Sequence, residues 1–237
     1  MQDKNHLFVT NGLPLDGVTV GVGSGQFSAQ NIRIDNSWYM FDAVTPHETY
    51  KDVRFGLPGH HNITNALLAL AMANVYGVAL SDIAKALETF KGVRRRFSYQ
   101  IKKQDMVYID DYAHHPTEID AVYQAVSELY PNDKVLAIFQ PHLFSRTRDF
   151  ADGFAKSLSK FENVALLDIY PARELPIEGV TSQWLLDKME NPNSRLVSKT
   201  DLLSLVKLTD ATVIVTIGAG DIGEMVPDIK KVLDEKD

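Results

Sequence analysis

Residues 109–118, IDDYAHHPTE, place two acids, two imidazoles and a phenol directly after the apolar run MVYI. Asp111 can accept hydrogen bonds from ribose hydroxyls, and His114 can orient a carboxylate or move a proton near neutral pH. Pro116 and Glu118 suit the first turn of a helix and are interpreted as structural. Because adjacent imidazoles and carboxylates are costly to leave without a role, the stretch favours a functional site over simple packing.

Residues 140–149, QPHLFSRTRD, bring basic side chains to the end of a second apolar run, VLAIF. Arg146 and Arg148 can clamp an anionic substrate, although Arg148 fits a surface helix equally well. His142 is either a site residue or a histidine whose polar atoms are satisfied by packing neighbours. This segment therefore predicts a site for a negatively charged group.

Residues 168–176, DIYPARELP, form a proline-bounded loop after the apolar run VALL. Asp168 and Glu174 carry carboxylates that can bind an amine, and Tyr170 adds a hydroxyl beside them. The alternative is that the loop only turns the chain.

Two further segments carry groups suited to a nucleotide. Asn62 and Asn65 in GHHNITNA are three residues apart at a predicted helix start, so they lie on nearly the same helix face. An amide both donates and accepts, which suits the edge of adenine, and helix capping by asparagine is the alternative. In GVRRRF, residues 92–97, three guanidinium groups can grip phosphate oxygens, with a solvated charge run as the alternative.

Residues 218–223, GAGDIG, match the glycine pattern of dinucleotide-binding loops and follow a predicted strand. About 14 residues remain after this loop, which leaves no room for a second strand carrying a ribose-binding acid. We therefore interpret GAGDIG as a tight strand-to-helix turn near the site. The sequence contains no G-x-x-x-x-G-K-[ST] phosphate loop, so the main phosphate cradle of any ATP site is expected outside this chain.

The elements that must position these segments fall into two parts. Residues 7–55 are β-rich, and two helical patterns follow at residues 62–77 and 81–92, with Ser81 as the expected N-cap of the second. After residue 96 strands alternate with helices. The expected strands there are SYQIK, MVYID, KVLAIF, NVALLDIY and TVIVTIG. The expected helices are PTEIDAVYQAVSELY, RDFADGFAKSLSKF, SQWLLDKM, TDLLSLVKL and EMVPDIKKVLDE.

This alternation predicts an α/β fold with a doubly wound, mostly parallel sheet that has helices on both faces. We place a domain boundary at Arg96, which gives domains of residues 1–96 and 97–237. Parallel sheets bind ligands at the carboxyl ends of their strands. All the candidate segments of the second domain follow strand ends, so they are expected to meet at one edge of the sheet.

Composition sets further expectations. The net charge of −7 gives no general case for a nucleic-acid partner. Cysteine is absent, which excludes disulfides and thiolate metal sites and fits a reducing cytoplasm. No long apolar span or secretory leader is present, so we expect no membrane partner, and the first residues suggest an excerpt of a longer protein.

Taken together and in order, these segments resemble the Mur ligase family. The motifs that carry the resemblance are GHHNITNALLALA, GVRRRF, DDYAHHPTEI, FQPHLFSRT, DIYPARE and GAGDIG. The family has a UDP-sugar domain, a central ATPase domain and a C-terminal α/β domain for the amino acid. The resemblance implies that residues 1–96 are the second half of the central domain and residues 97–237 the C-terminal domain. It also implies ATP and Mg²⁺ as cofactors, with the magnesium ligands in a part that this chain lacks.

The resemblance assigns nucleotide contacts residue by residue. Asn62 and Asn65 match the asparagines near adenine. Arg96 matches a phosphate-contacting arginine, and Asp111 matches the aspartate that holds the ribose. These four positions are therefore the expected ATP-binding residues.

The resemblance also implies a group of substrate contacts. His114, His142 and Arg146 match positions lining the amino-acid and muramyl-carboxylate region, and they are the expected catalytic residues. Asp168 and Tyr170 complete the expected substrate-binding set. No metal ligand is expected among these residues.

Within the family, FQPHxxSRT together with DIYPARE favours the member that joins L-alanine to UDP-N-acetylmuramate for peptidoglycan synthesis, over its tripeptide-recycling relative. Leu143 stands where some relatives carry an arginine, which makes the carboxylate clamp one charge lighter. Lacking a phosphate loop, the chain alone is expected to be inactive. A non-catalytic nucleotide-binding α/β module is the alternative from another class.

Overall fold

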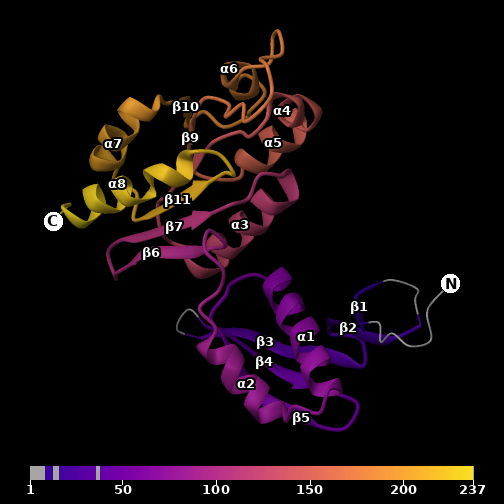
Figure 1. The fold of residues 1–237 in the computed structure, drawn as a ribbon. Helices are drawn as coiled ribbons and strands as arrows, with labels where there is room; N and C mark the ends of the chain where they lie inside the picture. Colours follow the sequence, from indigo (N-terminus) through magenta and orange to yellow (C-terminus); the bar gives the residue numbers. More distant parts are fainter. Residues whose placement is uncertain (1–8, 13–15, 36–37, 237) are drawn as a thin grey trace. The chain divides into compact units, whose positions relative to one another are not determined.

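The structure is a computed structural model that describes residues 9–12, 16–35 and 38–236. The chain divides into two compact units, unit 1 (Met1–Gly92) and unit 2 (Val93–Asp237), which are drawn in Figure 1. The division falls just before the arginine run at which we placed the domain boundary.

Unit 1 has one five-stranded sheet and two helices. The strands are β1 (Val9–Thr10), β2 (Val18–Val22), β3 (Phe27–Asp35), β4 (Trp38–Val44) and β5 (Thr49–Phe55), paired in sequence order. The β3, β4 and β5 strands pair antiparallel, whereas β1, β2 and β3 pair in parallel. The helices are α1 (His60–Val75) and α2 (Leu80–Thr89). The predicted change from strands to helices after residue 55 is confirmed.

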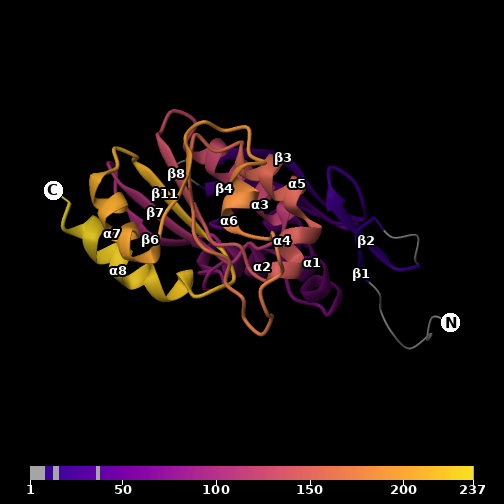
Figure 2. The same ribbon diagram turned by 90° about the horizontal axis from the view of Figure 1, so that it is seen from above.

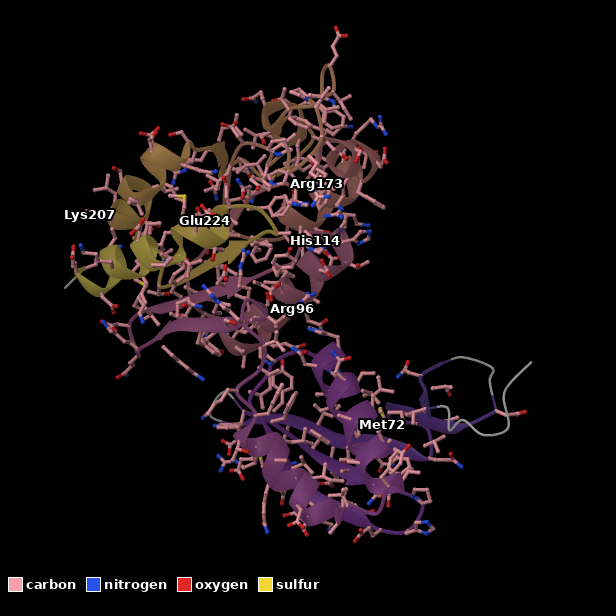
Figure 3. All side chains as sticks on the ribbon, in the orientation of Figure 1. Met72, Arg96, His114, Arg173, Lys207 and Glu224 are labelled. Carbon is pink, nitrogen blue, oxygen red and sulfur yellow. The ribbon has the colours of Figure 1, made fainter. Side chains whose placement is uncertain are left out.

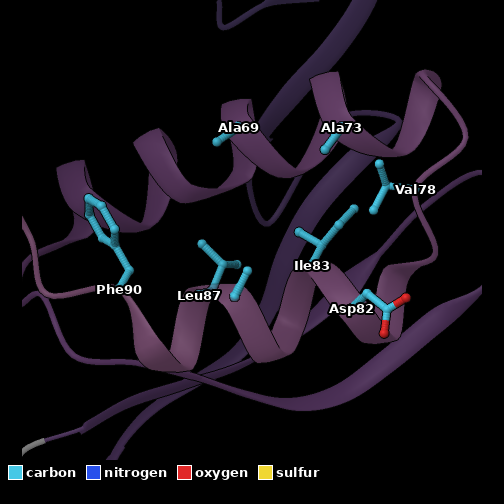
Figure 4. Close-up of a pocket in the computed structure, with 8 residues that line it drawn as sticks. Ala69, Ala73, Val78, Asp82, Ile83, Leu87 and Phe90 are labelled. Atoms are coloured by element: carbon cyan, nitrogen blue, oxygen red, sulfur yellow. The ribbon is translucent and has the colours of Figure 1, made fainter.

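An open pocket of about 330 Å³ lies between the α1 and α2 helices, and Figure 4 shows it in close-up. Its lining is apolar except for one carboxylate: Ala69, Ala73, Val78, Asp82, Ile83, Ala86, Leu87 and Phe90. No basic side chain lines it, so this pocket does not suit a phosphate or a carboxylate.

Unit 2 contains a six-stranded sheet in the order β10-β9-β8-β11-β7-β6. The strands are β6 (Ser98–Lys102), β7 (Val107–Asp111), β8 (Val135–Phe139), β9 (Asn163–Leu166), β10 (Ser194–Leu196) and β11 (Val213–Ile217). All neighbouring strands are parallel except β6, which pairs antiparallel with β7. The predicted mostly parallel α/β sheet is confirmed.

Helices cover both faces of this sheet, as Figures 1 and 2 show. On one face α3 (Pro116–Leu129), α5 (Ala151–Leu158) and α6 (Ser182–Leu186) bury apolar side chains against the strands. On the other face α7 (Lys199–Leu208) and α8 (Ile222–Asp234) do the same. The central strands β7 and β11 are buried along their whole length, which explains their continuous apolar runs.

Four details of unit 2 differ from the sequence expectation. The strand expected over residues 163–170 ends at Leu166. The helix expected over residues 148–161 is two helices, α4 (Phe144–Asp149) and α5, which meet at Phe150. The short edge strand β10 was missed because three residues carry too little periodicity. The helix expected over residues 182–189 ends at Leu186. Within the described residues, none of the helices combines the length and apolar character needed to cross a membrane.

Candidate functional site

The candidate segments of unit 2 start together at the carboxyl edge of the sheet. In register, Ile217 at the end of β11 pairs with Asp111 on β7 and with Phe139 on β8. Phe139 in turn pairs with Leu166 on β9. The loops that follow these four strands are therefore neighbours, as the sequence predicted.

Backbone hydrogen bonds join these loops to one another. The Gly218 N–H donates to the Asp111 carbonyl across 3.1 Å, and the Leu143 N–H donates to the Tyr170 carbonyl across 2.9 Å. His142 and Tyr170 form an isolated parallel bridge. The edge is thus a bonded framework rather than a set of separate loops.

Three aromatic rings make successive contacts at this edge of the sheet. The His142 ring stacks on Tyr170 with centroids 5.7 Å apart, and the centroids of the His114 and His142 rings are 6.3 Å apart. Arg146, one turn into α4, places its Nη1 atom 3.3 Å from the Nδ1 atom of His142. The structure therefore brings together His114, His142, Arg146 and Tyr170, four residues that the sequence analysis named as substrate contacts.

The His142–Arg146 contact fixes the protonation of the imidazole. Arginine only donates, so Nδ1 of His142 accepts and the proton of the neutral ring sits on Nε2. Burial lowers the pKa of His142, and the charges of Arg146 and His114 lower it further. His142 is therefore neutral near pH 7 and offers an N–H donor at Nε2.

The loop after β9 is tied to the start of α4. Glu174 accepts hydrogen bonds from the Ser145 N–H, at 2.9 Å, and from the Ser145 hydroxyl. These bonds hold the pKa of Glu174 below its ordinary value. Leu143, which precedes α4, has a φ of 73°, so a non-glycine residue adopts left-handed backbone here. Asp168, expected to touch substrate, is exposed beside this loop.

Asp111 is buried, with only 6% of its surface exposed. One carboxylate oxygen accepts the Phe97 N–H at 2.6 Å, and the other accepts the Ala113 N–H at 2.7 Å. Burial raises the pKa of Asp111 to about 6, although both hydrogen bonds and Arg96 oppose the shift. Each carboxylate oxygen keeps one lone pair that can accept from a ribose hydroxyl. The contact with a ribose itself stays a prediction.

Arg96 is half-exposed, and it can be followed with His114 in Figure 3. Its Nη1 atom lies 3.5 Å from Glu118, whose other oxygen accepts the His114 N–H at 2.8 Å. Glu118, which we interpreted as a simple first-turn residue of α3, thus links two predicted site residues. A carboxylate four residues after a site histidine was the signal available in the sequence.

Asn62 and Asn65 lie in unit 1, near the start of α1. Asn62 donates from Nδ2 to the Pro58 carbonyl at 2.7 Å, and Asn65 is exposed. Gly59 is the N-cap of α1 and receives no side-chain cap, so the capping alternative for these asparagines is wrong. Their predicted role at adenine stays a prediction.

The GAGDIG loop makes a tight strand-to-helix turn, as the sequence indicated. The Gln140 side chain accepts the Ile222 N–H at 2.9 Å and donates to Asp221 at 2.7 Å, so it caps the start of α8. A Cβ atom on Gly220 would lie 2.8 Å from the Tyr170 Cβ atom. Within the described residues, no strand follows α8.

Sequence analysis missed a buried ion pair at the base of the site. Arg95 donates from Nε to Asp110 at 3.0 Å and from Nη2 to the Gly218 carbonyl at 2.6 Å. The other Asp110 oxygen accepts from the Thr216 hydroxyl at 2.9 Å. The only signal in the sequence was a doubled aspartate at a strand end and an arginine run, which does not say which arginine is buried.

The chain is similar to a known protein family and to named proteins. The family described as "Mur ligase, glutamate ligase domain" matches residues 95–220. The chain is 70% identical over 237 residues to a UDP-N-acetylmuramate–L-alanine ligase of Flavobacterium psychrophilum, covering 100% of this chain and 53% of that protein. It is 64% identical over 236 residues to the same-named protein of Flavobacterium johnsoniae, covering 99% and 53%. The chain spans about half the length of the curated relatives it matches.

Solved structures agree with this comparison. A UDP-N-acetylmuramate–alanine ligase of Thermotoga maritima superimposes with a TM-score of 0.78 at 27% identity, covering 93% of this chain and 48% of that one. A folylpolyglutamate synthase of Mycobacterium tuberculosis, solved with ADP and AMPPCP, gives a TM-score of 0.68 at 16% identity, covering 89% and 48%. The second likeness concerns the fold alone.

Proposed function

Because the chain belongs to the Mur ligase family, we propose that it forms about half of an ATP-dependent ligase that joins L-alanine to the lactyl carboxylate of UDP-N-acetylmuramate. The names of the 70% and 64% identical relatives support this substrate pair. The activity belongs to the whole protein, of which residues 1–96 are proposed to complete the ATP-binding domain and residues 97–237 to bind the amino acid. The reaction serves peptidoglycan precursor synthesis in the cytoplasm.

The proposed reaction has two steps. A carboxylate resists attack by an amine until one of its oxygens becomes part of a leaving group. Transfer of the γ-phosphoryl group of ATP to the lactyl carboxylate gives an acyl phosphate and releases ADP. The alanine nitrogen then attacks the carbonyl carbon, the C–N bond forms, the bond to the phosphate oxygen breaks, and the amine loses a proton as phosphate leaves.

The observation that carries the proposal is the grouping of donors at one point of the sheet edge. Arg146 contributes a guanidinium, and His142 contributes the N–H at Nε2 beside it. Together they suit a carboxylate or an acyl phosphate oxygen. His114 and Tyr170 flank this pair through ring contacts. Leu143 adds no charge, so Arg146 supplies the one guanidinium of the FQPHLFSRT motif, 3.3 Å from His142.

We further propose that Asn62 and Asn65 bind adenine, Arg96 a phosphate and Asp111 the ribose of ATP. The described residues do not form a site that suits Mg²⁺. Among the described residues, no group of three or more His, Asp or Glu side chains is arranged to hold a metal ion. We therefore propose that the ligands of Mg²⁺ lie in the part of the ligase that this chain lacks.

The test is a hybrid ligase, in which this chain replaces the matching segment of the 70% identical relative. We expect the hybrid to form ADP from ATP only when UDP-N-acetylmuramate and L-alanine are both present. The isolated 237-residue chain should give no turnover, because it lacks a phosphate loop. Turnover with a peptide in place of L-alanine would instead favour the tripeptide-recycling function.

A matched pair of variants locates the activity in this chain. Arg146→Met in the hybrid should lower kcat/KM for L-alanine roughly a hundredfold, because the transition-state charge loses its guanidinium. Arg195→Met removes the same charge from an exposed position on β10 and should leave kcat/KM unchanged. Equal effects of the two substitutions would contradict the proposed site.

A further inference from the structure

The backbone on both sides of Arg96 is in an uncommon conformation. Arg95 has a φ of 60° and Phe97 a φ of 46°, so two non-glycine residues adopt left-handed backbone around one arginine. Such conformations persist where surrounding contacts hold them, and they cluster at functional sites. The contacts that hold this segment therefore indicate how Arg96 is placed.

Two hydrogen bonds tie the segment to the end of β7. The Phe97 N–H donates to the Asp111 carboxylate at 2.6 Å, and the Tyr112 N–H donates to the Arg95 carbonyl at 2.7 Å. The residue before Arg96 and the residue after it are therefore both held at the end of β7. The Arg96 side chain between them is half-exposed and lies 3.5 Å from the Glu118 carboxylate.

The Arg95 side chain supplies the third tie, and it is turned inward. Its side chain is 18% exposed and its partner Asp110 2% exposed. Besides the bonds to Asp110 and to the Gly218 carbonyl, the guanidinium lies 5.1 Å from the Tyr112 ring centroid. The donors of Arg95 are thus engaged by buried protein groups, whereas the half-exposed Arg96 pairs at 3.5 Å with the partly exposed Glu118.

Gly223 makes room for this arrangement. A Cβ atom at residue 223 would lie 2.6 Å from both Cζ and Nη1 of Arg95, too close for any real contact. Gly223 is the last glycine of the GAGDIG motif, so this motif leaves the space that the Arg95 guanidinium occupies.

We propose that Arg95 is a positioning residue: its buried ion pair with Asp110 holds the left-handed segment that presents Arg96 to the phosphate groups of ATP. This inference rests on the proposed function, since it assigns Arg96 to a nucleotide. Arg95 itself touches no substrate. The run of three arginines thus combines one anchor with one exposed phosphate contact.

Steady-state kinetics of the hybrid ligase test the inference. Arg95→Lys keeps the charge but loses the fork that spans Asp110 and Gly218. Gly223→Ala keeps both charges and displaces the guanidinium, so it provides a second route if Arg95→Lys folds poorly. Arg195→Lys and Gly179→Ala are the matched controls, because Arg195 is exposed and a Cβ atom on Gly179 meets no atom within 4 Å.

We expect Arg95→Lys and Gly223→Ala each to raise KM for ATP about tenfold, while KM for L-alanine stays within about twofold. Arg96→Lys should act in the same direction. Because Arg95 works through Arg96, the double variant Arg95→Lys/Arg96→Lys should be no worse than Arg96→Lys alone. Both controls should match the unmodified hybrid.

Three results would overturn the inference while leaving the proposed function intact: an unchanged KM for ATP, equal rises in both KM values, or additive effects in the double variant. The last two indicate that Arg95 only supports folding. Absence of alanine-dependent ADP formation in the unmodified hybrid would instead overturn the proposed function, and the inference with it.

Discussion

The guanidinium of Arg146 donates a hydrogen bond to Nδ1 of His142 across 3.3 Å. This contact joins the first turn of α4 to His142, which follows β8 and forms a parallel bridge with Tyr170 in the loop after β9. It places a permanent positive charge beside an imidazole and selects the tautomer that carries its proton on Nε2. We propose that an anion is bound by both residues at once.

The first prediction concerns the pKa of His142. Burial lowers it, and the positive charge of Arg146 is the next cause. Arg146→Met removes that charge and should raise the pKa of His142 towards the ordinary value near 6.5. A proton NMR titration of the histidine rings measures this. Arg148→Met serves as the control, because Arg148 pairs with Asp149, and an equal shift in both variants would contradict the contact.

The second prediction concerns stability and pH. Burial raises the pKa of Asp111 from 3.8 to about 6, so folding favours its neutral form. Its stabilising contribution is therefore complete below about pH 4 and is lost as the pH rises through 6. This rise of the pKa by about two corresponds to about 3 kcal/mol in the free energy of unfolding. Asp111→Asn should lack this slope between pH 4 and pH 7 in urea unfolding. Parallel curves for the two proteins would refute the assignment.

The third prediction concerns Gly220. A Cβ atom there would lie against Oε1 of Gln140 and 2.8 Å from the Tyr170 Cβ atom, so Gly220→Ala should displace the residue that caps α8. We expect a loss of about 2 kcal/mol in the free energy of unfolding. Gly179→Ala, with φ +75° and no atom near its Cβ, measures backbone strain alone and should cost about 1 kcal/mol. A smaller loss for Gly220→Ala than for Gly179→Ala would count against the close approach.

The fourth prediction concerns Glu174. Because its carboxylate accepts from both the N–H and the hydroxyl of Ser145, Glu174→Ala should speed exchange of the Ser145 amide hydrogen at pH 7. The hydrogen bonds lower the pKa of Glu174, so its contribution is present above pH 4.5 and is lost as the pH falls through the lowered value. Glu178→Ala, an exposed acid of the same loop, should leave the Ser145 amide unchanged. Equal exchange rates in the two variants would exclude the tie.

The fold of unit 2 was predictable because buried parallel strands and amphipathic helices have distinct periods. The strand predicted at SYQIK has the bounds of β6, and the helix predicted from Pro116 ends within one residue of α3. The common edge of the four loops followed from the rule for parallel strands. Local features were harder. Ser81 was expected to cap α2, but the helix begins at Leu80 after Ala79 and has no side-chain cap.

The grouping of His114, His142 and Arg146 was predictable from motifs after strand ends. The distinction between Arg95 and Arg96 was not. Adjacent residues in an arginine run are chemically identical, and the direction of each side chain depends on backbone dihedrals that periodicity does not encode. Sequence patterns also did not indicate that Asp110 and Asp111 are both buried, because aspartate is rarely buried unless it is paired.

The central claim is that this chain completes a ligase that activates a carboxylate as an acyl phosphate. The most direct test gives the hybrid ligase UDP-N-acetylmuramate labelled with oxygen-18 in the lactyl carboxylate, together with ATP and L-alanine. The account predicts that the released phosphate carries one labelled oxygen, which phosphorus NMR detects. Amide formation with unlabelled phosphate, or no alanine-dependent phosphate at all, would contradict it.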